Sequence, residues 1–170
     1  MEMWEVLDNE GNPTGKIMKK NEQIFFDKNF CHLGAEVWII NSDNKILIQK
    51  RSKQKKIFPN VWAMTGGSVI LGENSRETIV REAKEELNIN INPSELILIT
   101  KFKLDNLWVD TYVLKHDYDI KKMKLKKDEV IDVKWMTWEE IDNLVNEGNF
   151  MNYRWEFVKD LLNKEIKHLQ

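Results

Sequence analysis

The stretch "GGSVILGENSRETIVREAKEELNI", residues 66–89, decides the fold of this chain. Asn74 or Ser75 can cap a helix, because both residue types accept a hydrogen bond from the first turn. Asn88 tolerates the left-handed backbone conformation that ends many helices. The sequence therefore predicts a helix that runs from about Ser75 to Leu87.

The two sides of this predicted helix differ in chemistry. At about 100° per residue, the apolar side collects Ile79, Val80, Ala83 and Leu87. The other side carries Glu82, Glu85 and Glu86, whose mutual repulsion requires solvent, an arginine or a cation nearby. Mg²⁺ takes carboxylate oxygens together with waters and ligand phosphates, and the glycines at 66 and 67 leave backbone groups open to such an ion.

Composition limits the function classes. The 170 residues, of which 42% are hydrophobic, are enough for one domain over residues 1–170. A net charge of −2 gives no field that would favour nucleic acid or an acidic membrane, and the apolar runs are too short to span a bilayer. Cys31 is the single cysteine, and "MEMWEVLDNE" lacks the features of a signal peptide. We expect a reduced, cytoplasmic protein.

Strand and helix patterns surround the opening stretch. An N-terminal appendage, residues 1–30, contains a predicted hairpin of "MWEVLD" and "KIMKK", with turn residues Asn12, Pro13 and Gly15. "LGAEVWII" and "KILIQKRS" predict a second strand pair, "ELILITKFKL" and "LWVDTYVLKH" a third, and "VIDVKWM" a further strand. "TWEEIDNLVNEG", with a capping box at Thr137 and Glu140, and "NYRWEFVKDLLNKEIKHL" predict two more helices.

The spacing of the opening stretch resembles the Nudix box, G-x5-E-x7-R-E-U-x-E-E-x-G-U, in which U is a bulky aliphatic residue. The matching positions are Gly67, Glu73, Arg81, Glu82, Glu85, Glu86 and Ile89. Ala83 and Asn88 depart from the pattern, and neither position carries a catalytic group. The resemblance implies a Nudix fold, an α/β/α sandwich with a mixed β-sheet, from about Leu33 to the last helix. The N-terminal half resembles the branch that includes isopentenyl-diphosphate isomerase.

The resemblance also implies site residues. Glu82, Glu85, Glu86 and the carbonyl of Gly66 or Gly67 correspond to the ligands of Mg²⁺ or Mn²⁺. Arg81 and Glu73 correspond to a pair that orients Glu82. The general base comes either from the box or from a later loop, where Glu129 is the best candidate. In the cationic run "KRSKQKK", Arg51 is the candidate for binding substrate phosphate, because a guanidinium binds phosphate through two hydrogen bonds.

Several functions remain open on the sequence. The first is hydrolysis of a phosphoanhydride in a nucleoside diphosphate linked to another moiety, or in a similar small organic diphosphate. An alternative hydrolase removes oxidised nucleoside triphosphates. The isomerase requires a cysteine and a histidine in the stretch "WAMTGGSV", which has neither, and a non-catalytic ligand-binding module would have lost a box acid. We expect a small phosphorylated substrate. The sequence leaves the oligomeric state open: a homodimer is the commonest assembly, and the N-terminal hairpin is an element that two copies could exchange.

Overall fold

A computed structural model describes residues 2–20, 30–151 and 154–168. Its main sheet is mixed. Within the described residues its strands are β3 (His32–Ile40), β4 (Ile46–Arg51), β5 (Trp62–Ala63), β6 (Thr65–Ser68), β7 (Ile97–Leu104), β8 (Leu107–Lys115) and β9 (Val130–Met136). Their order is β5-β4-β3-β8-β7, while β6 pairs with β3 and β9 pairs with β4. The β3–β8 pair is parallel and the others are antiparallel, as a mixed sheet requires.

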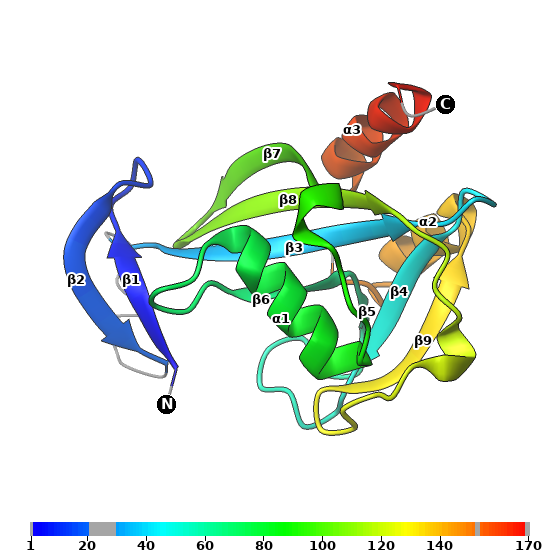
Figure 1. The fold of residues 1–170 in the computed structure, drawn as a ribbon, viewed down its shortest axis with the longest axis horizontal. Coiled ribbons are helices and arrows are strands. Elements are labelled where there is room, and N and C mark those ends of the chain that lie inside the picture. Colours follow the sequence, from blue (N-terminus) through cyan, green and yellow to red (C-terminus); the bar gives the residue numbers. More distant parts are fainter. Residues whose placement is uncertain (1, 21–29, 152–153, 169–170) are drawn as a thin grey trace.

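Helices cover both faces of this sheet (Figure 1). Side chains of β3 alternate between the faces, so Ile39 packs with the α1 (Ser75–Leu87) residue Ile79. Trp38 faces the other way and packs with residues of α2 (Trp138–Asn146) and α3 (Trp155–His168), among them Ile141 and Leu162. Short 3-10 turns occupy Pro93–Glu95 and Ile120–Lys122. The predicted α/β/α sandwich is confirmed.

The N-terminal hairpin consists of β1 (Met3–Leu7) and β2 (Pro13–Lys19), which form a separate two-stranded sheet. The tight turn lies earlier than predicted, because Asp8 Oδ1 accepts from the backbone N–H groups of Glu10 and Asn12 at 2.9 and 2.8 Å. Pro13 therefore begins β2 instead of forming the turn. Residues 21–29 of the predicted appendage lie outside the described residues, as do residues 152–153 of the predicted last helix.

The predicted pairing of residues 33–40 with residues 45–52 is wrong over most of its length. β3 and β4 meet in register only at Ile40 and Ile46. β6 takes the place beside the first half of β3, where Gly66 lies opposite Glu36. A Cβ on Gly66 would overlap the carbonyl oxygen of Ala35, so glycine permits this close approach.

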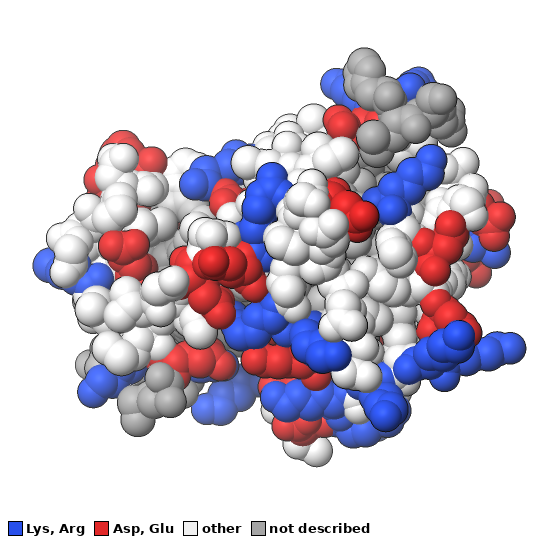
Figure 2. Space-filling view, viewed as in Figure 1, with Lys and Arg blue, Asp and Glu red and all other residues white. Residues whose placement is uncertain are grey.

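The predicted caps of α2 agree with the structure. Thr137 Oγ1 accepts from the N–H of Glu140 at 3.2 Å, and Glu140 Oε2 accepts from the N–H of Thr137 at 2.7 Å. Gly148 follows the helix with a φ of 71°. In the described ranges, none of the helices is both long and apolar enough to cross a membrane. Acidic and basic side chains alternate across the face that carries α1 (Figure 2).

His32, which lies where the hairpin meets the sheet, makes the unfolding free energy of the protein depend on pH. Its ring stacks on Trp4 with centroids 4.6 Å apart, and burial lowers the pKa of His32 to about 4. Between that value and the ordinary pKa of 6.5 the unfolded chain binds the extra proton, so stability falls as the pH drops through this window. We expect His32 to contribute up to about 3 kcal/mol of this loss.

Urea unfolding of the wild type and of His32→Asn at a series of pH values measures this contribution. The variant should lose less unfolding free energy than the wild type as the pH falls from 6.5 to 4. If the unfolding free energies of the two proteins changed with pH in parallel, His32 would not be the source of this pH dependence.

Candidate active site

The two ends of α1 are set by asparagines. Asn74 Oδ1 accepts from the N–H of Glu77 at 3.1 Å, and Glu77 Oε2 accepts from the N–H of Asn74 at 2.8 Å, so Asn74 is the cap. At the other end Asn88 has a φ of 57°, and its N–H donates to the carbonyl of Lys84 at 3.1 Å. Because asparagine adopts this left-handed conformation readily, the departure from glycine at Asn88 leaves the helix end intact.

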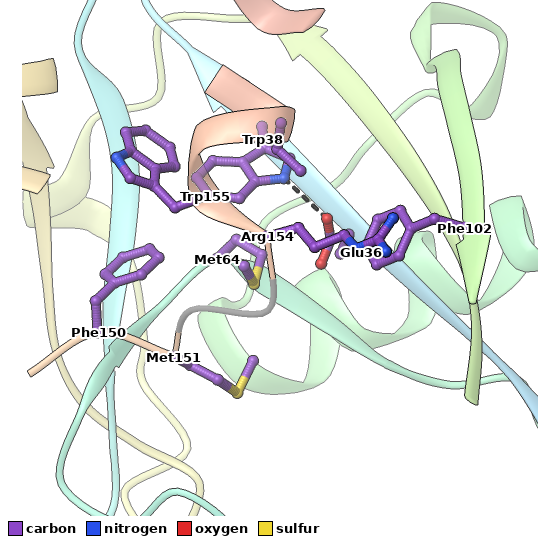
Figure 3. Close-up of a pocket in the computed structure, with 9 residues that line it drawn as sticks. Glu36, Trp38, Met64, Phe102, Phe150, Met151, Arg154 and Trp155 are labelled. Atoms are coloured by element: carbon purple, nitrogen blue, oxygen red, sulfur yellow. Dashed lines mark hydrogen bonds between the residues drawn. The ribbon is translucent and has the colours of Figure 1, made fainter. Parts of the chain in front are cut away.

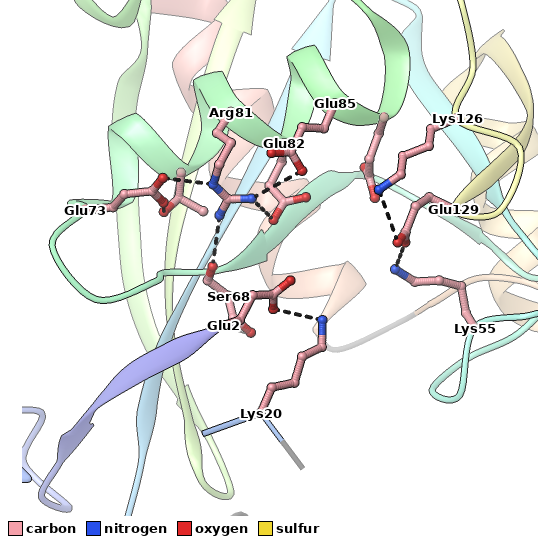
Figure 4. Close-up of polar contacts among 12 residues, drawn as sticks. Glu2, Lys20, Lys55, Ser68, Glu73, Arg81, Glu82, Glu85, Lys126 and Glu129 are labelled. Carbon is pink, nitrogen blue, oxygen red and sulfur yellow. Dashed lines mark hydrogen bonds and ion pairs between the residues drawn. The ribbon is translucent and has the colours of Figure 1, made fainter. Parts of the chain in front are cut away.

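Arg81 lies among the acids of the box (Figure 4). Its Nε donates to Glu73 Oε1 and its Nη1 to Glu82 Oε1, both at 2.8 Å. Nη1 also lies 3.6 Å from Glu85 Oε2, and Nη2 donates to the carbonyl of Ser68 at 3.3 Å. Three predicted acids, Glu73, Glu82 and Glu85, thus surround the Arg81 guanidinium, and this arrangement fixes the position of the Glu82 carboxylate.

Gly67 brings the backbone of β6 against Glu82. A Cβ at Gly67 would overlap the Glu82 carboxylate, whereas a Cβ at Gly66 would overlap main-chain atoms of β3. The contact places the Gly67 main chain beside a carboxylate of α1. Main-chain and carboxylate oxygens are the two ligand types that the sequence predicts for a metal ion.

Glu86 is the most buried of the box acids, with 4% of its surface exposed. Burial raises the pKa of Glu86 to about 7; the hydrogen bond from Gln49 Nε2 to Oε2, at 2.7 Å, acts against this, and the charge of Glu82 adds to it. Its other oxygen, Oε1, has no hydrogen-bond partner among the described residues. Gln49 was not predicted, although a glutamine in the buried strand "ILIQKR" was a usable signal.

These oxygens suit a hard divalent cation. Burial also raises the pKa of Glu82, although Arg81 opposes the shift, so two partly desolvated acids lie close together. A cation stabilises such a pair, and Mg²⁺ and Mn²⁺ prefer oxygen ligands. In the described ranges no three acidic, histidine or cysteine side chains already converge on one point. Arg81 contacts Glu82 and Glu85, so the guanidinium already sets the position of these two carboxylates.

Glu129 lies beside the C-terminal half of α1 (Figure 4). The N–H of Lys126 donates to the carbonyl of Glu86 at 3.0 Å, which ties the turn before β9 to the helix. Glu129 pairs with Lys55, and its Oε1 lies 3.8 Å from Lys126 Nζ. Burial would raise the pKa of Glu129, but the hydrogen bond and charge of Lys55 outweigh it, and the pKa is lowered. An anionic Glu129 can accept a proton once its ion pair with Lys55 is broken.

Arg51, the last residue of β4, and Lys55, in the loop that follows, have different contacts. Arg51 donates from Nε to the carbonyl of Phe58 and from Nη2 to the carbonyl of Ile57, both at 3.0 Å. Arg51 thus ties the loop together, and its predicted phosphate contact stays a prediction. The charges of Lys55 and Arg51 both lower the pKa of Glu86, and the charge of Lys55 also lowers the pKa of Glu82, so both cations lie near the acids. The sequence placed Lys55 only in a general cationic run.

Relatives match this chain over different lengths. The family model described as NUDIX domain matches residues 32–161. An uncharacterised Nudix hydrolase of Listeria monocytogenes is 32% identical over 96% of this chain and 95% of that protein. Isopentenyl-diphosphate Delta-isomerase of Escherichia coli is 31% identical, over 54% of this chain and 50% of that enzyme. The partial match agrees with the predicted resemblance to the isomerase branch.

Solved structures share the fold. A protein of Deinococcus radiodurans superposes with a TM-score of 0.73 and 22% identity, over 87% of this chain and 91% of that one. A bifunctional NMN adenylyltransferase/ADP ribose pyrophosphatase of Francisella tularensis, complexed with AMP and a Mn ion, superposes with a TM-score of 0.62 and 20% identity, over 78% of this chain and 41% of that one. The domain match and the relative of similar length show that this chain belongs to the Nudix hydrolase family.

Proposed function

We propose that this protein hydrolyses a phosphoanhydride bond, with Mg²⁺ or Mn²⁺, in a nucleoside diphosphate linked to another moiety or in a similar small organic diphosphate. The observation that carries the proposal is the buried Glu86 residue on the acidic side of α1, whose Oε1 has no hydrogen-bond partner among the described residues. A buried, charged carboxylate without a full set of hydrogen-bond partners destabilises the folded protein unless a cation binds to it. When bound, the ion neutralises the diphosphate and activates water for attack on phosphorus.

The box residues would hold and orient the ion. Glu82, Glu85, Glu86 and the carbonyl of Gly66 or Gly67 are the proposed ligands. Each proposed ligand contributes an oxygen, and these oxygens outnumber the basic side chains that contact them.

Arg81 and Glu73 would act through Glu82. Their ion pair holds the guanidinium at a fixed position, and the guanidinium in turn holds the Glu82 carboxylate. Groups that orient a metal ligand in this way commonly change metal affinity or activity by about 10-fold to 100-fold when replaced.

The proton of the attacking water would pass to Glu129 or to Glu82. Glu129 is charged and partly exposed, and its partner Lys55 is a flexible side chain that a substrate phosphate would attract. Lys55 would then neutralise the phosphate while Glu129 accepts the proton. Arg51 remains the second candidate for contact with phosphate.

Relatives and surface charge support a small nucleotide substrate. The Francisella tularensis neighbour is named for ADP ribose and holds AMP and Mn. The face that carries α1 mixes charges of both signs (Figure 2), and the net charge is −2. Nucleic acid and membrane surfaces require larger areas of positive charge, so a small anionic ligand fits better.

The alternatives differ in the products they would give. Removal of oxidised nucleoside triphosphates would use the same acids, so only the substrate distinguishes it. Isomerase chemistry requires a cysteine and a histidine in residues 62–69, and this stretch contains neither. Cys31 is buried against the backbone of Leu7, and His32 stacks on Trp4, so neither replaces them. All box acids are present, which disfavours a non-catalytic module.

A substrate panel with product identification tests the proposal. The panel comprises nucleotide sugars, ADP-ribose, dinucleoside polyphosphates, oxidised dGTP and isopentenyl diphosphate, each with Mg²⁺ and with a chelator. We expect monophosphate products from the diphosphate-linked compounds, and none in chelator. Pyrophosphate release from oxidised dGTP alone would favour the alternative hydrolase. Double-bond migration in isopentenyl diphosphate without phosphate release would overturn the hydrolase assignment.

A further inference from the structure

The main sheet divides beside the proposed metal site. β3 and β4 are register partners only at Ile40 and Ile46, and β8 and β9 occupy their other edges. Residues 62–68 therefore lie between β3 and β4 beyond this point. The first part of this segment, β5, pairs with β4, and the second part, β6, pairs with β3. Thr65 is the first residue of β6 and the register partner of Val37.

One buried amide, that of Gln49, crosses this division. Thr65 Oγ1 donates to Gln49 Oε1 at 3.2 Å, and Gln49 Nε2 donates to Glu86 Oε2 at 2.7 Å. All three residues are buried, and they belong to β4, β6 and α1. A buried amide destabilises the fold unless its polar ends are hydrogen-bonded, and here each end has a partner. Three elements are thus joined at one side chain.

The chemistry of the partners fixes the orientation of this amide. An ionised carboxylate only accepts hydrogen bonds, so the amide must turn its N–H₂ group toward Glu86. The amide oxygen then faces Thr65, and the Thr65 hydroxyl has to donate to it. Gln49 therefore occupies Oε2 of Glu86, and Oε1 is the oxygen left for an ion.

The same hydrogen bonds connect the two kinds of proposed metal ligand. Gly66 and Gly67, whose carbonyls are the backbone candidates, directly follow Thr65 in β6. Glu86, a carboxylate candidate, lies on α1 at the other end of the amide. The bond from Thr65 therefore holds the strand that carries the carbonyls, and the bond to Glu86 holds the carboxylate.

We propose that Gln49, held by Thr65, is a positioning residue of the metal site: it fixes the Glu86 carboxylate relative to the backbone of β6. This inference rests on the proposed function, because the ion is the one that the hydrolase would use. Gln49 takes no ligand position itself and acts through Glu86 and β6. Groups that hydrogen-bond a metal ligand commonly change metal affinity by about 10-fold to 100-fold when replaced.

A second buried acid provides a matched control. Glu36 faces α3 instead of α1, and it accepts from Trp38 Nε1 at 3.1 Å (Figure 3) and from Thr111 Oγ1 at 3.0 Å. Thr111 is buried like Thr65. Thr111→Val and Thr65→Val each remove one buried hydroxyl that donates within a carboxylate network, but only Thr65 is linked to Glu86.

Calorimetric titration of the substrate-free protein with Mn²⁺ measures ion affinity without turnover. Gln49→Met keeps an unbranched side chain of similar length and loses both hydrogen bonds, so we expect its affinity for Mn²⁺ to fall by about 10-fold to 100-fold. Thr65→Val should change the affinity in the same direction, and Thr65→Ser should restore it. The double variant should bind Mn²⁺ as Gln49→Met does, because Thr65 acts through Gln49. Thr111→Val should keep the wild-type affinity.

Melting curves show which variants are folded. A folded Gln49→Met protein with the wild-type affinity for Mn²⁺ overturns the proposal. If Gln49→Met does not fold, the wild-type affinity in folded Thr65→Val overturns it. An equal loss of affinity in Thr111→Val also overturns it, because general destabilisation would then explain the effect. A wild type that binds neither Mn²⁺ nor Mg²⁺ overturns the proposal together with the metal site. The expected affinities without cleavage of any panel substrate would reject the proposed function alone.

Discussion

Glu86→Gln is expected to lower kcat/KM by at least about 100-fold while the protein stays folded. The change keeps the volume of the side chain but removes an anionic ligand of the ion. Glu86 is buried and burial raises its pKa to about 7, so a neutral amide there should cost little stability. The amide oxygen can still accept from Gln49 Nε2.

Steady-state rates at saturating Mg²⁺, together with melting curves, check this expectation. Glu139→Gln removes an exposed acid from a different helix and should leave both quantities unchanged. A folded Glu86→Gln enzyme with rates near those of the wild type would remove Glu86 from the metal site.

Gly67→Ala is expected to lower kcat/KM by about 100-fold, the scale of an ångström-sized displacement at a reaction centre. The new methyl group would occupy the space of the Glu82 carboxylate, which is the flexible end of a side chain. Glu82 can move aside without unfolding β6. The predicted defect is therefore in activity and metal affinity, with a small change in stability.

Gly66→Ala provides the matched comparison one residue earlier. Its methyl group would meet the carbonyl of Ala35 and the backbone of Glu36, which cannot move without separating β3 from β6. We expect a loss of about 1–3 kcal/mol in the free energy of unfolding. Urea unfolding compares the stability of the two variants, and steady-state rates compare their activity. If Gly67→Ala were the less stable variant and Gly66→Ala the less active one, the described contacts of β6 would be wrong.

Sequence reasoning predicted the parts of this protein whose causes are local. The capping box at Thr137 and Glu140 involves neighbours in sequence, as does the left-handed end of α1 at Asn88. The resemblance to the Nudix box likewise implied a pair of Arg81 and Glu73, which the structure joins in an ion pair. Short-range geometry determines these contacts, so single residues were informative.

The remaining parts depend on pairing between distant segments. β3 pairs in parallel with β8 and antiparallel with β6, and no turn signal in the sequence indicates either pairing. This pairing gives Glu36 its position opposite Gly66. The contact of Gln49 with Glu86 also joins two elements far apart in sequence, so it could not be derived from spacing.

We propose that the acids of α1 hold a divalent ion needed for phosphoanhydride cleavage. The most direct test strips the wild-type enzyme of metal with a chelator, removes the chelator, and follows product release from its best panel substrate as Mg²⁺ is added back. We predict no turnover before addition and a saturable rise afterwards, and Glu86→Gln should require much more Mg²⁺ or show no rise. Full turnover by the stripped wild-type enzyme, unchanged by Mg²⁺ or Mn²⁺, would contradict the claim.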